Sequence, residues 1–108
     1  MSTDGMTLVC DLEVMNCAGM HTRVALLIFK KLESYKNCSA SLTRKSSGYT
    51  ADCRSVLDLL ALGAAQGEVL TLSVLGENAE TLQKELITLF ENKFYEDDKE
   101  MLEEENDK

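Results

Sequence analysis

The order of its polar and apolar patterns is the feature that most constrains how this chain folds. Patterns typical of strands with one buried face occur in four segments: 6–13, 38–44, 49–53 and 69–75. Apolar residues recur at helical spacing in three others: from residue 22 to about 34, 56–61, and from about 79 to near 93. The order strand, helix, strand, strand, helix, strand, helix predicts an α+β domain. Helices cover one face of its sheet, and the other face is open to water.

Short polar and glycine-containing segments mark the connections between these elements. The sequence Lys45-Ser46-Ser47-Gly48 is polar and ends in glycine, which predicts a hairpin turn between the second and third strands. Ser55 is placed to cap the helix over 56–61, because its hydroxyl can accept from backbone N–H groups two or three residues on. Gly63 and Gly67 end that helix and turn the chain toward the fourth strand.

The single histidine, His21, lies between a glycine turn and the start of the first predicted helix. Gly19 supplies backbone freedom just before it. The first turn of a helix has backbone N–H groups without an intrahelical partner and carries partial positive charge, so it binds anions. Arg23 adds a cation within reach of the same place. The alternatives are a plain N-cap or surface histidine for His21, and a solvated helix residue for Arg23.

A neutral imidazole beside an anion site points to phosphoryl transfer. Histidine is partly a free base near neutral pH, and its ring can attack phosphorus while amide N–H groups and Arg23 hold the transferred group. An anion at a helix start gains roughly 0.3–2 kcal/mol, and a hydrogen bond to a charged group nets about 1.5–3 kcal/mol. These magnitudes favour a carrier, since they stabilise the phosphoryl group without trapping it.

Length and charge predict one domain followed by an acidic tail. A chain of 108 residues with 44% apolar content suffices for a single core. Residues 95–108 carry eight acidic residues against two lysines, which accounts for −6 of the net charge of −8. We therefore expect a domain over 1–94 and a charged tail over 95–108. In an alternative interpretation, Met101 and Leu102 extend the last helix.

Charge and hydropathy exclude several classes of function. The net charge of −8 argues against general nucleic-acid binding. No apolar run is long enough to cross a membrane, and residues 1–5 lack the basic and apolar regions of a signal peptide, so we expect a cytoplasmic protein without membrane insertion. Six cations outside the tail leave room for a local basic face: Lys30, Lys31, Lys36, Arg44, Lys45 and Arg54.

The four cysteines do not form a recognisable metal or redox motif. Cys10, Cys17, Cys38 and Cys53 include no C-x-x-C pair, and one histidine cannot complete a common zinc set, so no metal site is expected. Free thiols are favoured over disulfides, since nothing indicates secretion. Cys17 lies four residues before His21 and keeps a third interpretation open, a cysteine-dependent enzyme or redox sensor.

Two motifs carry a resemblance to a known family. The first is Gly19-Met20-His21-Thr22-Arg23-Val24-Ala25. It resembles the Gly-Leu/Ile-His-Ala-Arg-Pro-Ala active-site motif of HPr, the histidine-containing phosphocarrier of the phosphoenolpyruvate:sugar phosphotransferase system. The second, residues 53–67, resembles that family's Lys-Ser-Ile/Leu-x-x-x-x-x-Leu-Gly-x-x-x-Gly segment. The resemblance covers roughly residues 6–94. It implies an open-faced β-sandwich, with a four-stranded antiparallel sheet and three helices on one face.

The resemblance also implies a function. His21 accepts a phosphoryl group from enzyme I and gives it to enzyme IIA, while Arg23 and the backbone amides of Thr22 and Arg23 hold that group. The protein is then a monomeric carrier without a cofactor, and not an enzyme with independent turnover. Ser55 corresponds to the serine that HPr kinase/phosphorylase modifies in some bacteria. Four apolar residues are candidates for partner docking: Met20, Val56, Leu57 and Leu60.

The chain departs from the family pattern at several positions. Val24 replaces the proline, which keeps a backbone N–H and is expected to loosen the first helical turn. Thr22 replaces the usual alanine, Arg54 replaces the common lysine, and the acidic tail has no counterpart in typical members. These departures support an alternative function, a mainly regulatory relative that acts through phospho-Ser55 and protein binding.

Overall fold

The computed structural model describes residues 7–95, and these form the predicted order of elements. The bounds are β1 Thr7–Glu13, α1 Thr22–Glu33, β2 Cys38–Arg44, β3 Thr50–Asp52, α2 Val56–Ala61, β4 Val69–Gly76, α3 Ala79–Glu91 and the 3₁₀ helix η1 Lys93–Tyr95. Most ends agree with the sequence patterns within one residue. The expected strand start at Met6, the tail beyond 95 and the alternative helix through Met101 and Leu102 lie outside the described residues.

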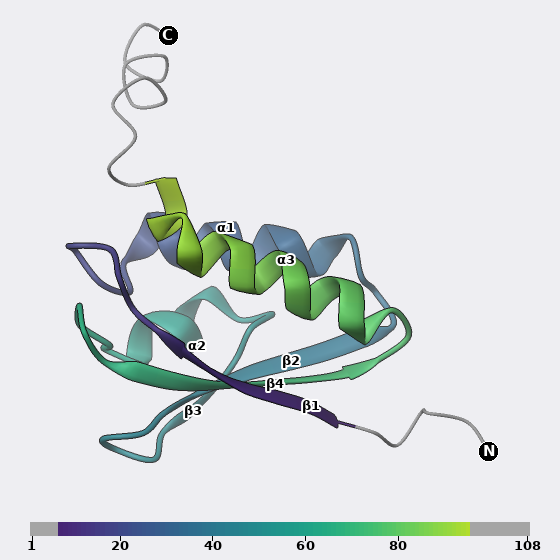
Figure 1. Cartoon of the computed structure of the whole chain (residues 1–108), viewed down its shortest axis with the longest axis horizontal. Coiled ribbons are helices and arrows are strands. Elements are labelled where there is room, and N and C mark those ends of the chain that lie inside the picture. Colours follow the sequence, from purple (N-terminus) through teal and green to yellow (C-terminus); the bar gives the residue numbers. More distant parts are fainter. Residues whose placement is uncertain (1–6, 96–108) are drawn as a thin grey trace, which may run out of the picture.

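The four strands form one antiparallel sheet in the order β1-β4-β2-β3. In the register of this sheet, Leu72 of β4 is paired with Cys10 of β1 on one side and with Leu42 of β2 on the other. Apolar residues of β1, β4 and β2 therefore line up across one face. In Figure 1, α1 and α3 lie side by side over this face, and no helix is drawn beneath β1, β4 and β2. The predicted open sheet covered on one side is confirmed.

Burial along the strands confirms the predicted alternation. The inward residues of the two central strands are almost fully covered: Ala40, Leu42, Leu70, Leu72 and Val74. Residues of the opposite parity face outward, and Val9 on β1 keeps 58% of its surface exposed. From the helices, the core receives Ile28 and Leu32 of α1 and Leu82 and Leu86 of α3. Because one face is buried, a one-residue slip of any strand would turn its apolar set toward water.

Arg54 terminates α1, a role that its sequence position did not indicate. The guanidinium donates to the carbonyls of Leu32 at 3.1 Å, Tyr35 at 2.6 Å and Cys38 at 2.7 Å. These carbonyls belong to the last turn of α1 and to the segment leading into β2, where helical carbonyls lack intrahelical partners and a cation is favoured. Arg54 therefore joins the start of α2 to the end of α1.

The last predicted helix ends earlier than expected. α3 stops at Glu91 instead of near Lys93, and after Asn92 the residues Lys93–Tyr95 form η1 with left-handed backbone, φ between 52° and 60°. A left-handed conformation costs about 1–2 kcal/mol per non-glycine residue. The turn is held because it buries Phe94, whose ring packs edge-on against Phe90 with centroids 4.8 Å apart. Tyr95, the last described residue, packs against the core beside this turn.

The cysteines are free thiols in this structure. Cys38 and Cys53 are buried, and burial raises the pKa of the Cys53 thiol to about 12. Desolvation also raises the pKa of Cys38 and of the partly buried Cys10. A thiol that resists ionisation is a poor nucleophile and metal ligand. Among residues 7–95, no cluster of three or more His, Cys, Asp or Glu side chains could hold a metal ion.

Within the described part of the chain, none of the helices combines the length and apolar character needed to cross a membrane.

Candidate functional site

His21 is the residue that opens α1. Its backbone is extended, with φ −128° and ψ −176°, and its carbonyl accepts the N–H of Ala25 at 2.9 Å. The amides of Thr22, Arg23 and Val24 therefore precede the first intrahelical hydrogen bond, as at any helix start. The His21 side chain makes no capping hydrogen bond to these amides. His21 is thus the N-cap residue of α1 by position, but its imidazole does not cap the amides of the first turn.

The imidazole lies in a surface hollow with the other predicted phosphate-binding residues. The hollow has a volume of about 600 Å³ and is lined by His21, Thr22, Arg23, Leu26, Leu27 and Lys30. His21 is partly exposed, yet its Nε2 atom is covered by protein. Access to the ring from the hollow is therefore expected at Nδ1.

The sequence analysis missed Leu26 and Leu27 of this hollow, and it named Lys30 only as part of a basic face. Leu26, Leu27 and Lys30 follow Arg23 at spacings of three, four and seven residues, which is one face of a helix. Periodicity counted from Arg23, instead of from the core residue Val24, would have found them. They give the site an apolar wall and a second cation.

The loop before His21 is fixed by close approach to the loop after α2. The Met20 N–H donates to the carbonyl of Ala64 at 2.9 Å, and the buried Asn16 amide donates to the Gly19 carbonyl at 2.8 Å. Gly19 has φ +72°, and a Cβ there would lie 2.6 Å from the Ala64 carbonyl oxygen. Glycine is required here both for its left-handed backbone and for space.

The segment that contains Ala64, whose carbonyl accepts the Met20 N–H, is stabilised by an ion pair. Arg44 binds Glu68 through two hydrogen bonds of 2.7 and 2.8 Å, and Glu68 also accepts from the Ala65 N–H at 3.0 Å and the Ser46 hydroxyl at 3.0 Å. The Arg44 guanidinium first, then the Ala65 amide, holds the pKa of Glu68 at about 2. The chain around Ala65 is thereby tied to the end of β2.

The second motif forms α2, whose start is capped as predicted. The Ser55 hydroxyl accepts the Asp58 N–H at 3.1 Å, which satisfies an amide of the first turn. The Asp58 carboxylate in turn accepts from the Asp52 N–H at 2.9 Å and the Tyr49 hydroxyl at 2.6 Å, and these bonds lower its pKa. Since α2 also packs against α1, Ser55 belongs to the same side of the fold as the first helix.

The four apolar docking candidates differ sharply in exposure. Leu57 keeps 79% of its surface exposed, the largest value among exposed large apolar residues of the described chain. Val56 and Leu60 are half-buried and pack on the core. Met20 is only 8% exposed, because the loop bond to Ala64 turns it inward. Leu57 is thus well placed for docking, and Met20 is mainly a core residue.

The expected basic face is not continuous. Arg44 is paired with Glu68, Lys45 donates to Asp11 at 2.7 Å, and Lys31 lies 3.4 Å from Glu85. Arg54 is occupied by the carbonyls at the end of α1. Positive charge near His21 is therefore supplied by Arg23 and Lys30, from the first helix itself.

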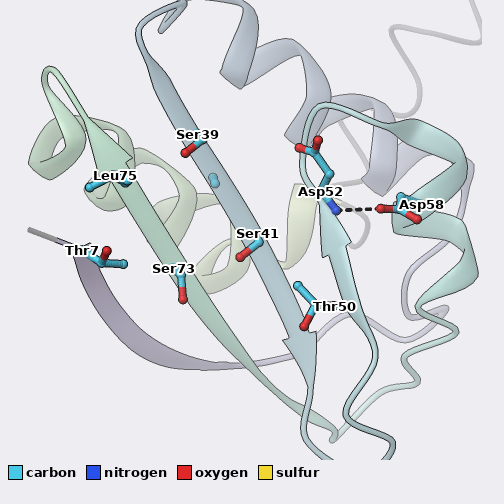
Figure 2. Close-up of a pocket in the computed structure, with 9 residues that line it drawn as sticks. Thr7, Ser39, Ser41, Thr50, Asp52, Asp58, Ser73 and Leu75 are labelled. Carbon is cyan, nitrogen blue, oxygen red and sulfur yellow. Dashed lines mark hydrogen bonds between the residues drawn. The ribbon is translucent and has the colours of Figure 1, made fainter. Parts of the chain in front are cut away.

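A second hollow, on the open face of the sheet, has different chemistry. It measures about 410 Å³ and is lined by Thr7, Ser39, Ala40, Ser41, Thr50, Asp52, Asp58, Ser73 and Leu75. Figure 2 shows hydroxyls from several strands around it and the Asp52 N–H bonded to Asp58. The hollow offers no cation, and the Asp58 carboxylate is already used by the backbone and by Tyr49. It does not suit an anion such as phosphate.

The chain is similar in sequence to known phosphocarrier proteins. Residues 9–92 match a family described as "PTS-HPr: PTS HPr component phosphorylation site". The chain is 32% identical over 92 residues to the phosphocarrier protein NPr of Escherichia coli (strain K12), covering 85% of this chain and all of that protein. It is 29% identical over 87 residues to the phosphocarrier protein HPr of Xylella fastidiosa (strain Temecula1 / ATCC 700964), covering 81% and 94%.

Solved structures show the same fold. The crystal structure of HPr-C-His from Thermoanaerobacter tengcongensis superposes with a TM-score of 0.75 at 27% identity, covering 82% of this chain and 97% of that one. The phosphocarrier protein HPr from Bacillus anthracis str. Ames gives a TM-score of 0.72 at 17% identity, covering 80% and 99%. The second similarity is evidence for the fold alone.

We predict that Gly19→Ala destabilises the protein much more than Gly48→Ala. Both glycines have positive φ, +72° and +79°, so each substitution costs about 1–2 kcal/mol of backbone strain. Only at Gly19 does the new methyl meet backbone, since nothing lies within 4 Å of a Cβ at Gly48. Urea unfolding measures the difference, which we expect to exceed about 1 kcal/mol. Equal losses would contradict the close approach to Ala64.

We also predict that Glu68 makes stability depend on acid pH. Its folded pKa of about 2 lies below the ordinary value of 4.5, so Glu68 stabilises the fold above about pH 4.5. That contribution decreases as the pH falls toward 2. The urea concentration at the midpoint of unfolding, measured from pH 6 to pH 2, should be lower for Glu68→Gln than for wild type at pH 6. It should then decrease less steeply with falling pH than the midpoint of wild type does. Glu13→Gln, at the exposed end of β1, controls for the loss of one charge.

Proposed function

Because this chain belongs to the HPr family of phosphotransferase-system phosphocarriers, we propose that it relays a phosphoryl group through His21. In this proposal, enzyme I donates the group and enzyme IIA receives it. The observation that carries the proposal is the hollow that joins the imidazole, Arg23 and the amide-rich start of α1. Proteins named HPr and NPr both match, so the proposal concerns the relay and not a particular sugar.

The ring nitrogen that takes the group is Nδ1. Because Nε2 is covered by protein, Nδ1 is the nitrogen that the hollow leaves accessible to the incoming phosphorus, and attack there uses the tautomer with its proton on Nε2. A new N–P bond forms there while the N–P bond of the donor phosphohistidine breaks. The donor nitrogen keeps the electron pair of that bond. No oxidation and no net proton transfer are needed, so the reverse chemistry delivers the group to the acceptor.

The start of α1 holds the transferred group. Amides that precede the first intrahelical bond donate to phosphoryl oxygens, and the Arg23 guanidinium offsets their charge. The Thr22 hydroxyl adds a donor that alanine would not supply. Each charged hydrogen bond nets about 1.5–3 kcal/mol. This stabilisation is moderate, as a relay requires, because a tightly held group would not pass to the next protein.

Partner proteins dock on the surface formed by α1 and α2. Leu26 is 40% exposed beside His21, and Leu57 is 79% exposed on the neighbouring α2. Exposed apolar side chains around a polar centre are typical of protein-binding surfaces. The protein acts as a cytoplasmic monomer, its domain over 1–94 being the substrate of its partners. Without these partner proteins, the protein catalyses no turnover of its own.

A second, regulatory function is proposed for Ser55. Ser55 is partly exposed at the start of α2 and lies two residues before the exposed Leu57. A phosphate added there by an HPr kinase/phosphorylase introduces about −1.5 to −2 charges next to the docking surface. The start of a helix tolerates this charge, so the main effect falls on docking and not on folding.

We predict that mixing the purified protein with phosphoenolpyruvate and enzyme I adds the mass of one phosphoryl group to wild type and none to His21→Ala. The product should be acid-labile, as phosphohistidine is and phosphoserine is not. Ser55→Ala serves as the matched control and should be labelled like wild type. Intact mass spectrometry gives the answer, and labelling of His21→Ala would defeat the assignment of His21.

For the regulatory function, we predict that Ser55→Asp slows phosphoryl transfer from enzyme I while Ser55→Ala leaves the rate close to wild type. The added carboxylate repels an acidic partner near Leu57, and the retained oxygen keeps the cap of α2, so thermal stability should change little. Rapid-quench kinetics and thermal unfolding measure the two quantities. An unchanged rate for Ser55→Asp would remove the support for this function.

A further inference from the structure

Asn16 is the one polar or charged residue that is buried among residues 7–95. Its side chain is fully covered, yet the side-chain oxygen Oδ1 has no hydrogen-bond partner in this part of the chain. Burying an acceptor without a donor costs free energy, because the group gives up its hydrogen bonds to water. A leucine, which has a similar branched shape, would avoid that cost. The presence of an asparagine is therefore explained by its other polar group, the side-chain amide nitrogen Nδ2.

The side-chain amide of Asn16 holds the carbonyl of Gly19. Nδ2 donates to that oxygen at 2.8 Å, and the Gly19 N–H donates to the Asn16 backbone carbonyl at 3.2 Å. One residue further along the chain, the Met20 N–H donates to the Ala64 carbonyl at 2.9 Å. The peptide unit between Gly19 and Met20 is therefore fixed at both ends. Asn16 binds its oxygen, and Ala64 binds its N–H.

This peptide unit needs both bonds, because the glycine before it does not restrain its orientation. Gly19 has φ +72° and no Cβ, so the peptide unit can rotate about the ψ bond of Gly19 at little steric cost. Such a rotation would turn the oxygen away from Asn16 and change the direction in which the chain enters α1. His21 follows one residue later, as the N-cap residue of that helix. The direction of its side chain thus depends on a peptide plane that Asn16 holds.

We propose that Asn16 is a positioning residue for the phosphoryl acceptor His21. By holding the Gly19 carbonyl, its amide fixes the backbone from which the imidazole extends, so that Nδ1 is accessible from the hollow and Nε2 stays covered. Asn16 is fully buried and does not line the hollow, so it acts through Gly19 and not by contact with the phosphoryl group. Its effect on transfer rests on the function proposed for His21, whereas its effect on the ring does not.

The effect on the ring can be measured without phosphoryl transfer. Asn16→Leu removes the donor and keeps a branched side chain, and Asn16→Ala removes the donor with a smaller one. His21 is the only histidine of the chain, so the signals of its two ring nitrogens are assigned directly. In ¹⁵N-labelled protein at about pH 8, where most of the imidazole is neutral, both variants should shift the Nδ1 and Nε2 signals relative to wild type.

Gln66→Ala is the matched control. The Gln66 side-chain amide donates to the Met15 carbonyl at 3.1 Å, so this variant also removes a bond from a side-chain amide to a backbone carbonyl between the same two loops. The bond lies outside the peptide unit between Gly19 and Met20. Gln66→Ala should therefore leave the ring nitrogen signals and the rate of phosphoryl transfer close to wild type.

Rates of phosphoryl acceptance from enzyme I then test the positioning role. For both Asn16 variants, kcat should be roughly 10- to 100-fold lower, since misplacing a reacting group by about 1 Å costs up to about a hundredfold. KM should stay close to wild type, because the exposed residues Leu26 and Leu57 are unchanged. A protein that is only destabilised behaves differently. Fewer folded molecules raise the apparent KM and leave kcat unchanged.

Each result decides the proposal. Unchanged ring signals would overturn it whatever the rates, and so would shifted signals with an unchanged kcat or a change confined to KM. Loss of folding in both Asn16 variants would assign the residue to the fold alone, and equal effects in Gln66→Ala would assign them to any bond between the two loops. If wild type accepts no phosphoryl group, the function proposed for His21 fails, while the ring signals still decide whether Asn16 fixes the imidazole.

Discussion

The structure depends most on one close backbone approach, between Gly19 and the carbonyl of Ala64. A Cβ at residue 19 would lie 2.6 Å from that oxygen, and the Met20 N–H donates to it at 2.9 Å. This bond joins the loop after β1 to the loop after α2, over 44 residues of sequence. It turns Met20 inward, and His21 then follows as the partly exposed N-cap residue of α1. The position of His21 is thus a consequence of backbone packing.

The two loops are joined by further hydrogen bonds that avoid the hollow. The Val14 N–H donates to the Glu68 carbonyl at 2.8 Å, and the Gly67 N–H donates to the Val14 carbonyl at 2.7 Å. Behind them, Arg44 holds the Glu68 side chain. None of these groups lines the hollow at His21. This arrangement combines a fixed ring position with access for a large partner.

Local sequence patterns predicted the helices and strands but did not predict the contacts between residues far apart in the sequence. Alternation located β2 and β4, and the cap at Ser55 followed from its place before an apolar helical pattern. The role of Arg54 depends on carbonyls 16 to 22 residues away, and that of Glu68 on an arginine 24 residues away. Charge alone suggested a basic face for these cations. A sequence gives the charge of an arginine, but only the fold decides what its guanidinium meets.

Val24 shows how packing can replace a local conformational constraint. The family motif has proline here, which presets φ and lacks an N–H. In this chain Val24 is 1% exposed and Ala25 fully buried, so the first turn of α1 is pinned by core contacts instead. Burying a valine side chain stabilises the fold by about 1.5–3 kcal/mol, and this opposes the flexibility expected for the first turn of α1. Valine also keeps an amide that precedes the first intrahelical bond, one more donor beside His21 than a proline would leave. A helix start built in this way gains an anion-binding group without losing its position.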